Sequence, residues 1–201
     1  MKKIILILIL FSLLGCKSTL KKTYGITEPK LEDRTSIYKY LNKKKIDTSN
    51  VYIFKNLSAY AKASKLKLMS IPDAVFFNKE GYFVDYKKKA SDCNAKVDAF
   101  LLDLTTFSKL PSVQTKKMDD LLHFIENSKS DKPINAADIN VFITWAVFAG
   151  KLNDEKAFEW VYLLEKAKKE GFKINYYLIN CDIQKSWKLS DEELQGLGII
   201  N

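Results

Sequence analysis

The chain has 201 residues, of which 33 are basic and 24 acidic, so it carries a formal net charge of +9 at pH 7. Arg34 is the only arginine, whereas proteins that bind nucleic acid usually rely on arginine to contact bases and phosphates. One histidine and three cysteines without a Cys-x-x-Cys pair provide no recognisable set of zinc ligands. We therefore expect no nucleic-acid partner, no metal and no other cofactor.

The N-terminus has the pattern of a signal peptide. Two lysines follow Met1, and residues 4–14 are almost wholly apolar. This run is too short to span a membrane, which takes about 20 apolar residues. It ends in Leu-Leu-Gly-Cys at residues 13–16, which resembles the bacterial lipobox. The resemblance implies that residues 1–15 are a cleaved signal peptide and that Cys16 carries acyl chains such as palmitate. The alternative is a secretory signal with an incidental cysteine.

Residues 16–30 are expected to be the lipidated N-terminus and a polar, basic tether. More than one acyl chain gives stable anchoring to a membrane. No aspartate follows Cys16, and in lipoproteins this favours the outer membrane, with the domain facing the periplasm or the cell surface. Cleavage removes two lysines and lowers the formal charge to +7. The remaining lysines suit a solvated surface, and some of them could rest against anionic headgroups.

Residues 31–110 contain an alternation of helix and strand signals. A helix is expected over residues 32–45, a β-rich strand over 51–54 and a helix over 57–66. Strands at 74–77 and 82–86 flank a tight turn with Gly81, which predicts a β-hairpin. Apolar residues at helical spacing then indicate a helix up to Phe107, before Pro111.

Residues 111–201 begin with an amphipathic helix over 118–125 and a polar connection. An apolar strand is expected over 139–145, a long helix over 153–169 with Asn153 as its N-cap, and a strand over 174–179. A capping box at Ser190–Glu193 opens the last helix. The β-α-β order predicts two parallel strands with a right-handed crossover, so the fold class is α/β.

Two stretches resemble thioredoxin. In the first, residues 63–81, Ser70-Ile71-Pro72 precedes the hairpin, as a similar turn does in that family. The resemblance implies a cis Ile71–Pro72 bond that faces the active site. The second stretch is residues 141–152, where Trp145, Ala146 and Gly150 match a strand that runs into the family's Cys-Gly-Pro-Cys motif. Ala149 and Leu152 stand where the family has its cysteines, and Lys151 stands where it has proline.

The two stretches occur in swapped order relative to the family. The resemblance therefore implies a thioredoxin-like mixed sheet flanked by helices, in permuted or tandem order. Strands 51–54 and 174–182 would compete for one position in a single sheet, which favours two units, 31–110 and 111–201, or an enlarged sheet. The alternative is a generic α/β protein that happens to show these patterns.

The expected binding groove contains Pro72, Asp73, Ala149, Gly150 and Lys151. Asp73 could bind a partner there, or it could be an ordinary turn aspartate. Cys93 and Cys181 form a candidate disulfide, since an exported compartment permits one, or they are two buried free thiols.

The leading functional hypothesis is a membrane-anchored lipoprotein with a redox-inactive binding or scaffold domain. Its partner would be a protein or an extended peptide, held by strand addition in the groove. The alternative is a thiol-disulfide enzyme that uses Cys93 or Cys181. A third hypothesis is a component of a larger assembly with no groove function. Because the thioredoxin-type cysteines are absent, we expect the protein not to be an enzyme.

Overall fold

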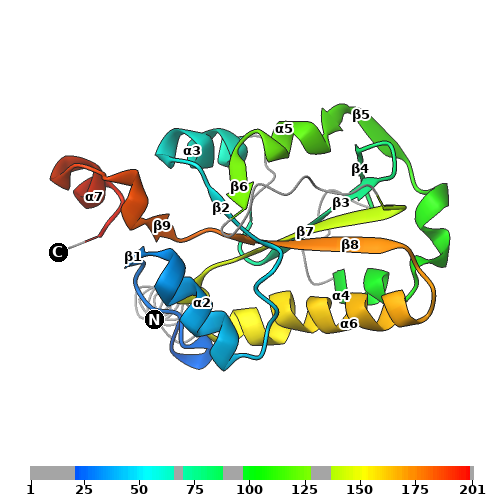
Figure 1. The fold of residues 1–201 in the computed structure, drawn as a ribbon, viewed down its shortest axis with the longest axis horizontal. Helices are drawn as coiled ribbons and strands as arrows, with labels where there is room; N and C mark the ends of the chain where they lie inside the picture. Colours follow the sequence, from blue (N-terminus) through cyan, green and yellow to red (C-terminus); the bar gives the residue numbers. More distant parts are fainter. Residues whose placement is uncertain (1–20, 66–69, 88–96, 128–136, 200–201) are drawn as a thin grey trace, which may run out of the picture.

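The computed structural model describes residues 21–65, 70–87, 97–127 and 137–199. This part of the chain is a mixed α/β fold with a seven-stranded sheet of order β5-β4-β3-β7-β8-β2-β6 (Figure 1). A separate parallel pair joins β1 to β9. The strands are β1 (Leu31–Glu32), β2 (Val51–Phe54), β3 (Asp73–Asn78), β4 (Tyr82–Val84), β5 (Ser112–Lys117), β6 (Ile125–Asn127), β7 (Ile139–Trp145), β8 (Ile174–Asn180) and β9 (Ile183–Gln184).

Helices cover both faces of the sheet. Helices α2, α4 and α6 lie on one face, and α3 and α5 lie on the other (Figure 1). The helices are α2 (Arg34–Lys43), α3 (Leu57–Lys65), α4 (Val97–Leu101), α5 (Met118–Leu122), α6 (Phe158–Lys169) and α7 (Asp191–Gly196). Within the described ranges, no helix is long and apolar enough to cross a membrane.

The strands of residues 31–110 and 111–201 share one sheet. β3 pairs with β7 antiparallel, whereas β8 is parallel to β7 on one side and to β2 on the other. β2 thus lies next to β8 instead of competing with it for one position. Of the two alternatives, separate units or an enlarged sheet, the structure shows the enlarged sheet. Strands from the two halves of the chain therefore build a common core rather than two separate sheets.

Alternate residues of the central strands enter two apolar clusters. In β2, Val51 and Ile53 pack towards α2, α4 and α6, whereas Tyr52 and Phe54 pack towards α3 and α5. This follows from the two-residue period of a strand, whose side chains point to opposite faces. Buried Trp145 and Trp160 lie in the first cluster, as expected for large apolar side chains. A third, small cluster forms around Ile183, Leu194 and Ile199 at the end of the molecule.

Some elements differ from the sequence-based expectation. The helix expected over 118–125 ends at Leu122, and Ile125 begins β6. The helix expected up to Phe107 is divided into α4 and a 3-10 helix, Leu104–Lys109. The edge strands β5 and β6 were not predicted because they are short and mostly polar, so neither shows a clear two-residue apolar alternation. The capping box at Ser190–Glu193 is confirmed.

Asn153 was predicted as an N-cap, and this prediction is wrong. A π-helical stretch, Asn153–Ala157, precedes α6 with Leu152 as its N-cap, and the Asn153 Oδ1 accepts no hydrogen bond from the described residues. Its side chain is fully buried and donates instead to the carbonyl oxygen of Ala146, at 2.7 Å. The amide therefore ties the beginning of the helix to the end of β7.

Candidate functional site

The candidate site lies where the parallel strands β7 and β8 end side by side, with Trp145 opposite Asn180. β3 runs antiparallel to β7 and begins at this end, with Asp73 opposite Thr144. The peptide bond between Ile71 and Pro72 is cis, as predicted. Carboxyl ends of neighbouring parallel strands are a common location of binding sites in α/β folds. The two stretches that resemble thioredoxin thus meet at one end of the sheet.

The loop after β7 is fixed by buried polar groups. It consists of Ala146, a 3-10 turn (Val147–Ala149) and Gly150, whose φ of 59° favours glycine. The Asn153 amide donates to Ala146 and also to the hydroxyl of Tyr40, at 3.0 Å. The Tyr40 hydroxyl in turn lies 3.4 Å from the carbonyl oxygen of Gly150, to which it donates. Hydrogen bonds from the side chains of Tyr40 and Asn153 therefore hold the loop at both of its ends, Gly150 and Ala146.

Asp182 fixes the middle of the same loop. It follows β8 and is only 2% exposed, and its Oδ2 accepts hydrogen bonds from the backbone N–H of Val147 and the amide of Asn180, both at 2.7 Å. Oδ1 is buried and has no hydrogen-bond partner among the described residues. Burial, with a further contribution from the charge of Glu32, raises the pKa of Asp182 to about 6, although the hydrogen bonds oppose this shift.

A network of amides surrounds Asp182. Asn180 accepts hydrogen bonds from the Asp182 N–H and from the Gln184 amide, and Gln184 also donates to the carbonyl oxygen of Asp182. Asn180 and Gln184 are buried, so these bonds form away from competing water. The segment that leads from β8 into β9 therefore has a defined backbone path.

The residues expected to form the groove are unequal in exposure. Ala149 is 3% exposed and Asp73 is 7% exposed, whereas Lys151 is exposed. The Asp73 carboxylate accepts from the N–H of Ala74, and its own N–H donates to the Thr144 hydroxyl. Asp73 thus interacts with neighbouring backbone in the way a turn aspartate does, and Pro72 and Gly150 are half-buried beside these strand ends.

The cysteines provide no exposed thiol in the part of the chain that the structure describes. Cys181 is a free thiol, 1% exposed, and both its burial and the neighbouring Asp182 raise its pKa. A thiol whose pKa is raised forms less of the reactive thiolate. Cys16 and Cys93 lie outside the described residues, so the acylation of Cys16 and the pairing of Cys93 with Cys181 stay predictions.

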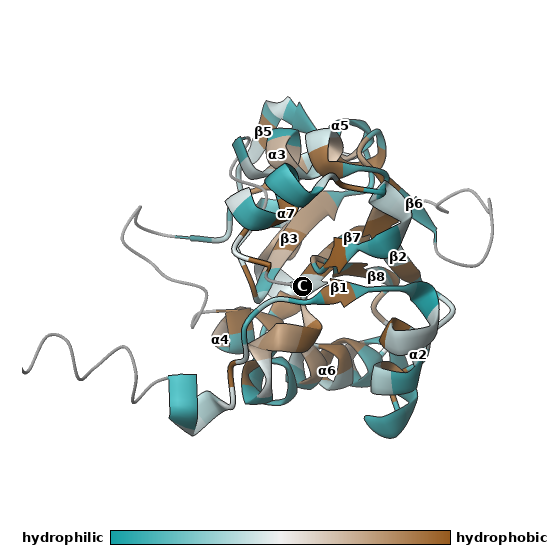
Figure 2. Cartoon of the chain, turned by 90° about the vertical axis from the view of Figure 1, so that its left-hand side faces the viewer, coloured by the Kyte–Doolittle hydropathy of each residue, from teal (hydrophilic) through white to brown (hydrophobic). Residues whose placement is uncertain are grey.

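Residues 21–32, which we name the strap, begin with a helical turn over residues 21–24 and continue as non-helical backbone across the loop after β7. These residues were expected to belong largely to a tether, but they lie on the domain. The N–H of Thr27 donates to the carbonyl oxygen of Phe148 at 3.0 Å, and β1 at the end of the strap pairs with β9. A Cβ atom at Gly150 would collide with the carbonyl oxygens of Tyr24 and Gly25. In Figure 2, which views the molecule from this end, β1 lies in front of the central strands.

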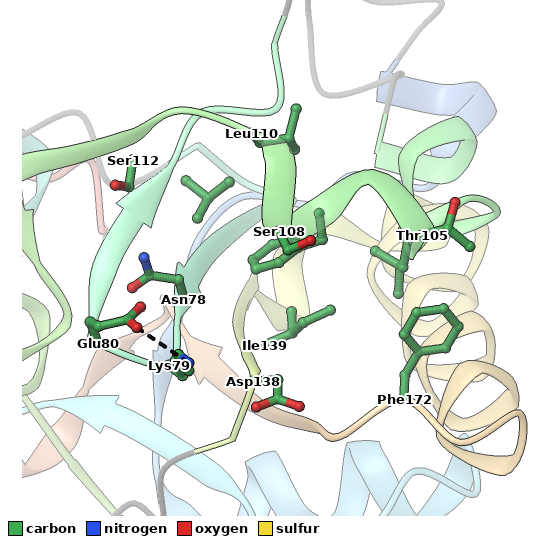
Figure 3. Close-up of a pocket in the computed structure, with 13 residues that line it drawn as sticks. Asn78, Lys79, Glu80, Thr105, Ser108, Leu110, Ser112, Asp138, Ile139 and Phe172 are labelled. Carbon is green, nitrogen blue, oxygen red and sulfur yellow. Dashed lines mark ion pairs between the residues drawn. The ribbon is translucent and has the colours of Figure 1, made fainter.

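A separate hollow of about 590 Å³ lies near the beginning of β7 and the turn between β3 and β4 (Figure 3). Lys79, Glu80, Asp138 and Phe172 contribute to its wall, and Lys79 lies 3.7 Å from Glu80. The charges of this lysine and this glutamate therefore offset each other. None of the residues predicted for the groove lines it.

Sequence reasoning found Pro72, Asp73 and the Ala149–Lys151 loop but missed the strap and Asp182. The signal for Asp182 was present, because an acidic residue two positions after a buried parallel strand is unusual. The described residues of this end bring together no nucleophile and base, but they do bind an extended backbone segment. Comparison of the chain with protein-family models, with characterised proteins and with solved structures finds no match.

Proposed function

We propose that this chain is an exported lipoprotein, anchored through Cys16, whose thioredoxin-like domain is a redox-inactive binding module. It holds an extended peptide segment of a protein partner at the carboxyl ends of β7 and β8. The observation that carries the proposal is that this end already holds the non-helical part of the strap, residues 26–32, through main-chain hydrogen bonds to Phe148 and β9. Main-chain recognition of this kind gives affinity without a specific reactive group.

The side chains at the site favour binding over thiol chemistry. Thiol-disulfide exchange needs a thiolate and a second thiol nearby. Ala149 and Leu152 occupy the positions at which the resemblance would place those thiols, and Cys181 is buried with a raised pKa. The arrangement of β3, β7 and β8 in one mixed sheet supports the thioredoxin-like part of the proposal.

The proposal can be tested by site-specific photo-crosslinking of the full, anchored chain in its native membrane. A photoreactive residue at Lys151 would stand at the exposed edge of the loop, next to Gly150. A matched control at Tyr162 would stand on α6, where the side chain is 65% exposed. Each adduct would be identified by mass spectrometry.

A defined protein adduct at Lys151 that is absent at Tyr162 is the expected result. An excess of a synthetic peptide with the sequence of residues 22–33 should reduce this adduct, because the peptide would occupy the same surface. Equal adducts at both positions, or none at Lys151, would overturn the proposal.

A further inference from the structure

The strap is held by few interactions, whereas the loop that it covers is fixed by buried hydrogen bonds. Among the described residues, the N–H of Thr27 makes the one backbone hydrogen bond from the strap to the loop after β7, and the ladder of β1 with β9 extends over only two residues. The ion pair between Lys21 and Glu28 is exposed, and such pairs contribute little to stability. By contrast, the Asn153 amide and the Asp182 carboxylate fix the loop beneath the strap from buried positions. Segments with few buried contacts are those that open locally at low cost.

The apolar side chains of the strap are only partly buried. Leu31 is half-buried and packs against the small third cluster, which contains Ile183, Leu194 and Ile199. Ile26 and Pro29 are also half-buried, whereas Thr27, Glu28 and Lys30 are exposed. Because Leu31 is the described strap residue that packs against a buried apolar cluster, its removal should weaken docking most.

The strap also begins immediately after the proposed anchor. Five residue steps separate Cys16 from Lys21, and an extended chain spans about 18 Å over that length. If the strap leaves the domain, the free chain extends from Cys16 to Asp33, where the side chain caps α2. That length spans at most about 60 Å. Docking of the strap therefore determines how far the domain reaches from the membrane.

We propose that the strap is the resident ligand of the peptide site, and that a partner's extended peptide displaces it and so releases the domain from the membrane surface. This inference rests on the proposed function, because it assumes that the strap and the partner use the same site. The occupant in the absence of a partner is the chain's own segment, residues 21–32. A ligand that replaces it needs an extended backbone, a donor at the Thr27 position and an apolar side chain at the Leu31 position.

Competition with a tethered segment reduces the apparent affinity of a free peptide. The strap acts at a high effective concentration, of the order of millimolar for a short linker. The apparent dissociation constant of a competitor rises in inverse proportion to the fraction of sites that the strap leaves empty. Weakening the strap should therefore tighten peptide binding without any change in the site itself.

The test uses the lipidated full chain in phosphatidylcholine vesicles and a fluorescent peptide of residues 22–33. Thr27→Pro removes the N–H that donates to Phe148, and Thr27→Ala keeps it as the matched control. We expect at least tenfold tighter peptide binding by Thr27→Pro than by Thr27→Ala. A fluorophore at Tyr162 and acceptor lipids report the distance to the membrane, and energy transfer should fall in Thr27→Pro and remain at the wild-type level in Thr27→Ala.

A second pair of variants tests the same inference in case Thr27→Pro does not fold. Leu31→Asp removes the apolar contact of the strap, whereas Thr23→Asp makes the same change of charge at an exposed position of the strap. In the wild-type chain, a saturating peptide should also accelerate hydrogen exchange at the Thr27 amide. Equal peptide binding by variants and controls, or peptide binding with unchanged energy transfer, overturns the inference. A Lys151 adduct obtained together with either result would leave the proposed function standing.

Discussion

The Asp182 carboxylate accepts a hydrogen bond from the backbone N–H of Val147 at 2.7 Å, so the residue after β8 holds the turn after β7. Both residues follow the ends of adjacent parallel strands, and the contact bridges those ends. The carboxylate is nearly inaccessible to solvent, and its second oxygen has no partner among the described residues. Keeping this buried carboxylate charged therefore lowers the free energy of unfolding, and the effect should be measurable.

The first prediction concerns pH and Asp182. Its pKa is about 6 in the folded protein and about 3.9 in an unfolded chain, so between these values the folded state binds the additional proton. Its contribution to stability is present below about pH 4 and is lost as the pH rises through 6. The free energy of unfolding should fall by up to about 3 kcal/mol over this window. Asp182→Asn should remove this slope, as measured by urea unfolding at pH 4.5 and pH 7.5.

Glu32→Gln provides the control for this assignment. The negative charge of Glu32 contributes to the raised pKa of Asp182, so its removal should move the midpoint of the pH dependence towards lower pH. The neighbouring groups Cys181 and Tyr60 both have raised pKa values and stay neutral in this range. An unchanged pH profile in Asp182→Asn would show that another group is responsible.

The second prediction concerns the buried amide of Asn153. Asn153→Ala removes the hydrogen bonds to Ala146 and to the Tyr40 hydroxyl and leaves a buried carbonyl without its donor. We expect a loss of about 2 kcal/mol in the free energy of unfolding. Tyr40→Phe is the milder comparison, because it removes the hydroxyl but keeps the ring stacked on Trp145 at 5.7 Å, and it should cost about 1 kcal/mol. The reverse order of the two effects would contradict this account of the loop.

The central part of the sheet could be predicted from the sequence because burial produces strong local patterns. β7 was predicted with its observed bounds from a continuous apolar run, and Ser190 and Glu193 identified the final capping box. The edge strands were missed because residues such as Lys116 and Lys117 in β5 face solvent and show no apolar period. β1 and β9 were missed because a two-residue ladder depends on tertiary contacts and hardly on local propensity.

The site was predicted only in part for a related reason. The resemblance to thioredoxin located Pro72 and the loop at Ala149–Lys151, which the structure places at one end of the sheet. It could not indicate the strap, because the contact between Thr27 and Phe148 joins residues far apart in the sequence. The polar composition of the strap suggested a free tether, although its main chain provides the interactions that hold it in place.

The third prediction concerns the anchor. Cys16 should be the N-terminal residue of the mature protein and should carry acyl chains, because residues 4–16 have the pattern of a signal peptide with a lipobox. Mass spectrometry of the purified chain measures this directly. Cys16→Ser should release the protein from the membrane or leave it unprocessed. An unmodified N-terminus in the wild-type protein, or a retained signal peptide, would contradict the prediction.

The last prediction is that the protein has no thioredoxin-type reductase or oxidase activity. Exchange needs a thiolate nucleophile and a second thiol that resolves the mixed disulfide. At the loop that resembles the family motif, Ala149 and Leu152 provide neither, and the strap contacts this loop through Phe148 and Gly150. The Cys181 thiol is buried, and its raised pKa lowers the thiolate fraction. Insulin reduction with dithiothreitol should therefore proceed at the background rate with the wild-type protein and with Cys93→Ser and Cys181→Ser. Thr27→Pro, which frees the strap, should also remain at background, because exposing the loop adds no thiol to it. Turnover in the wild-type protein that disappears in either serine variant would replace the binding module with a thiol enzyme.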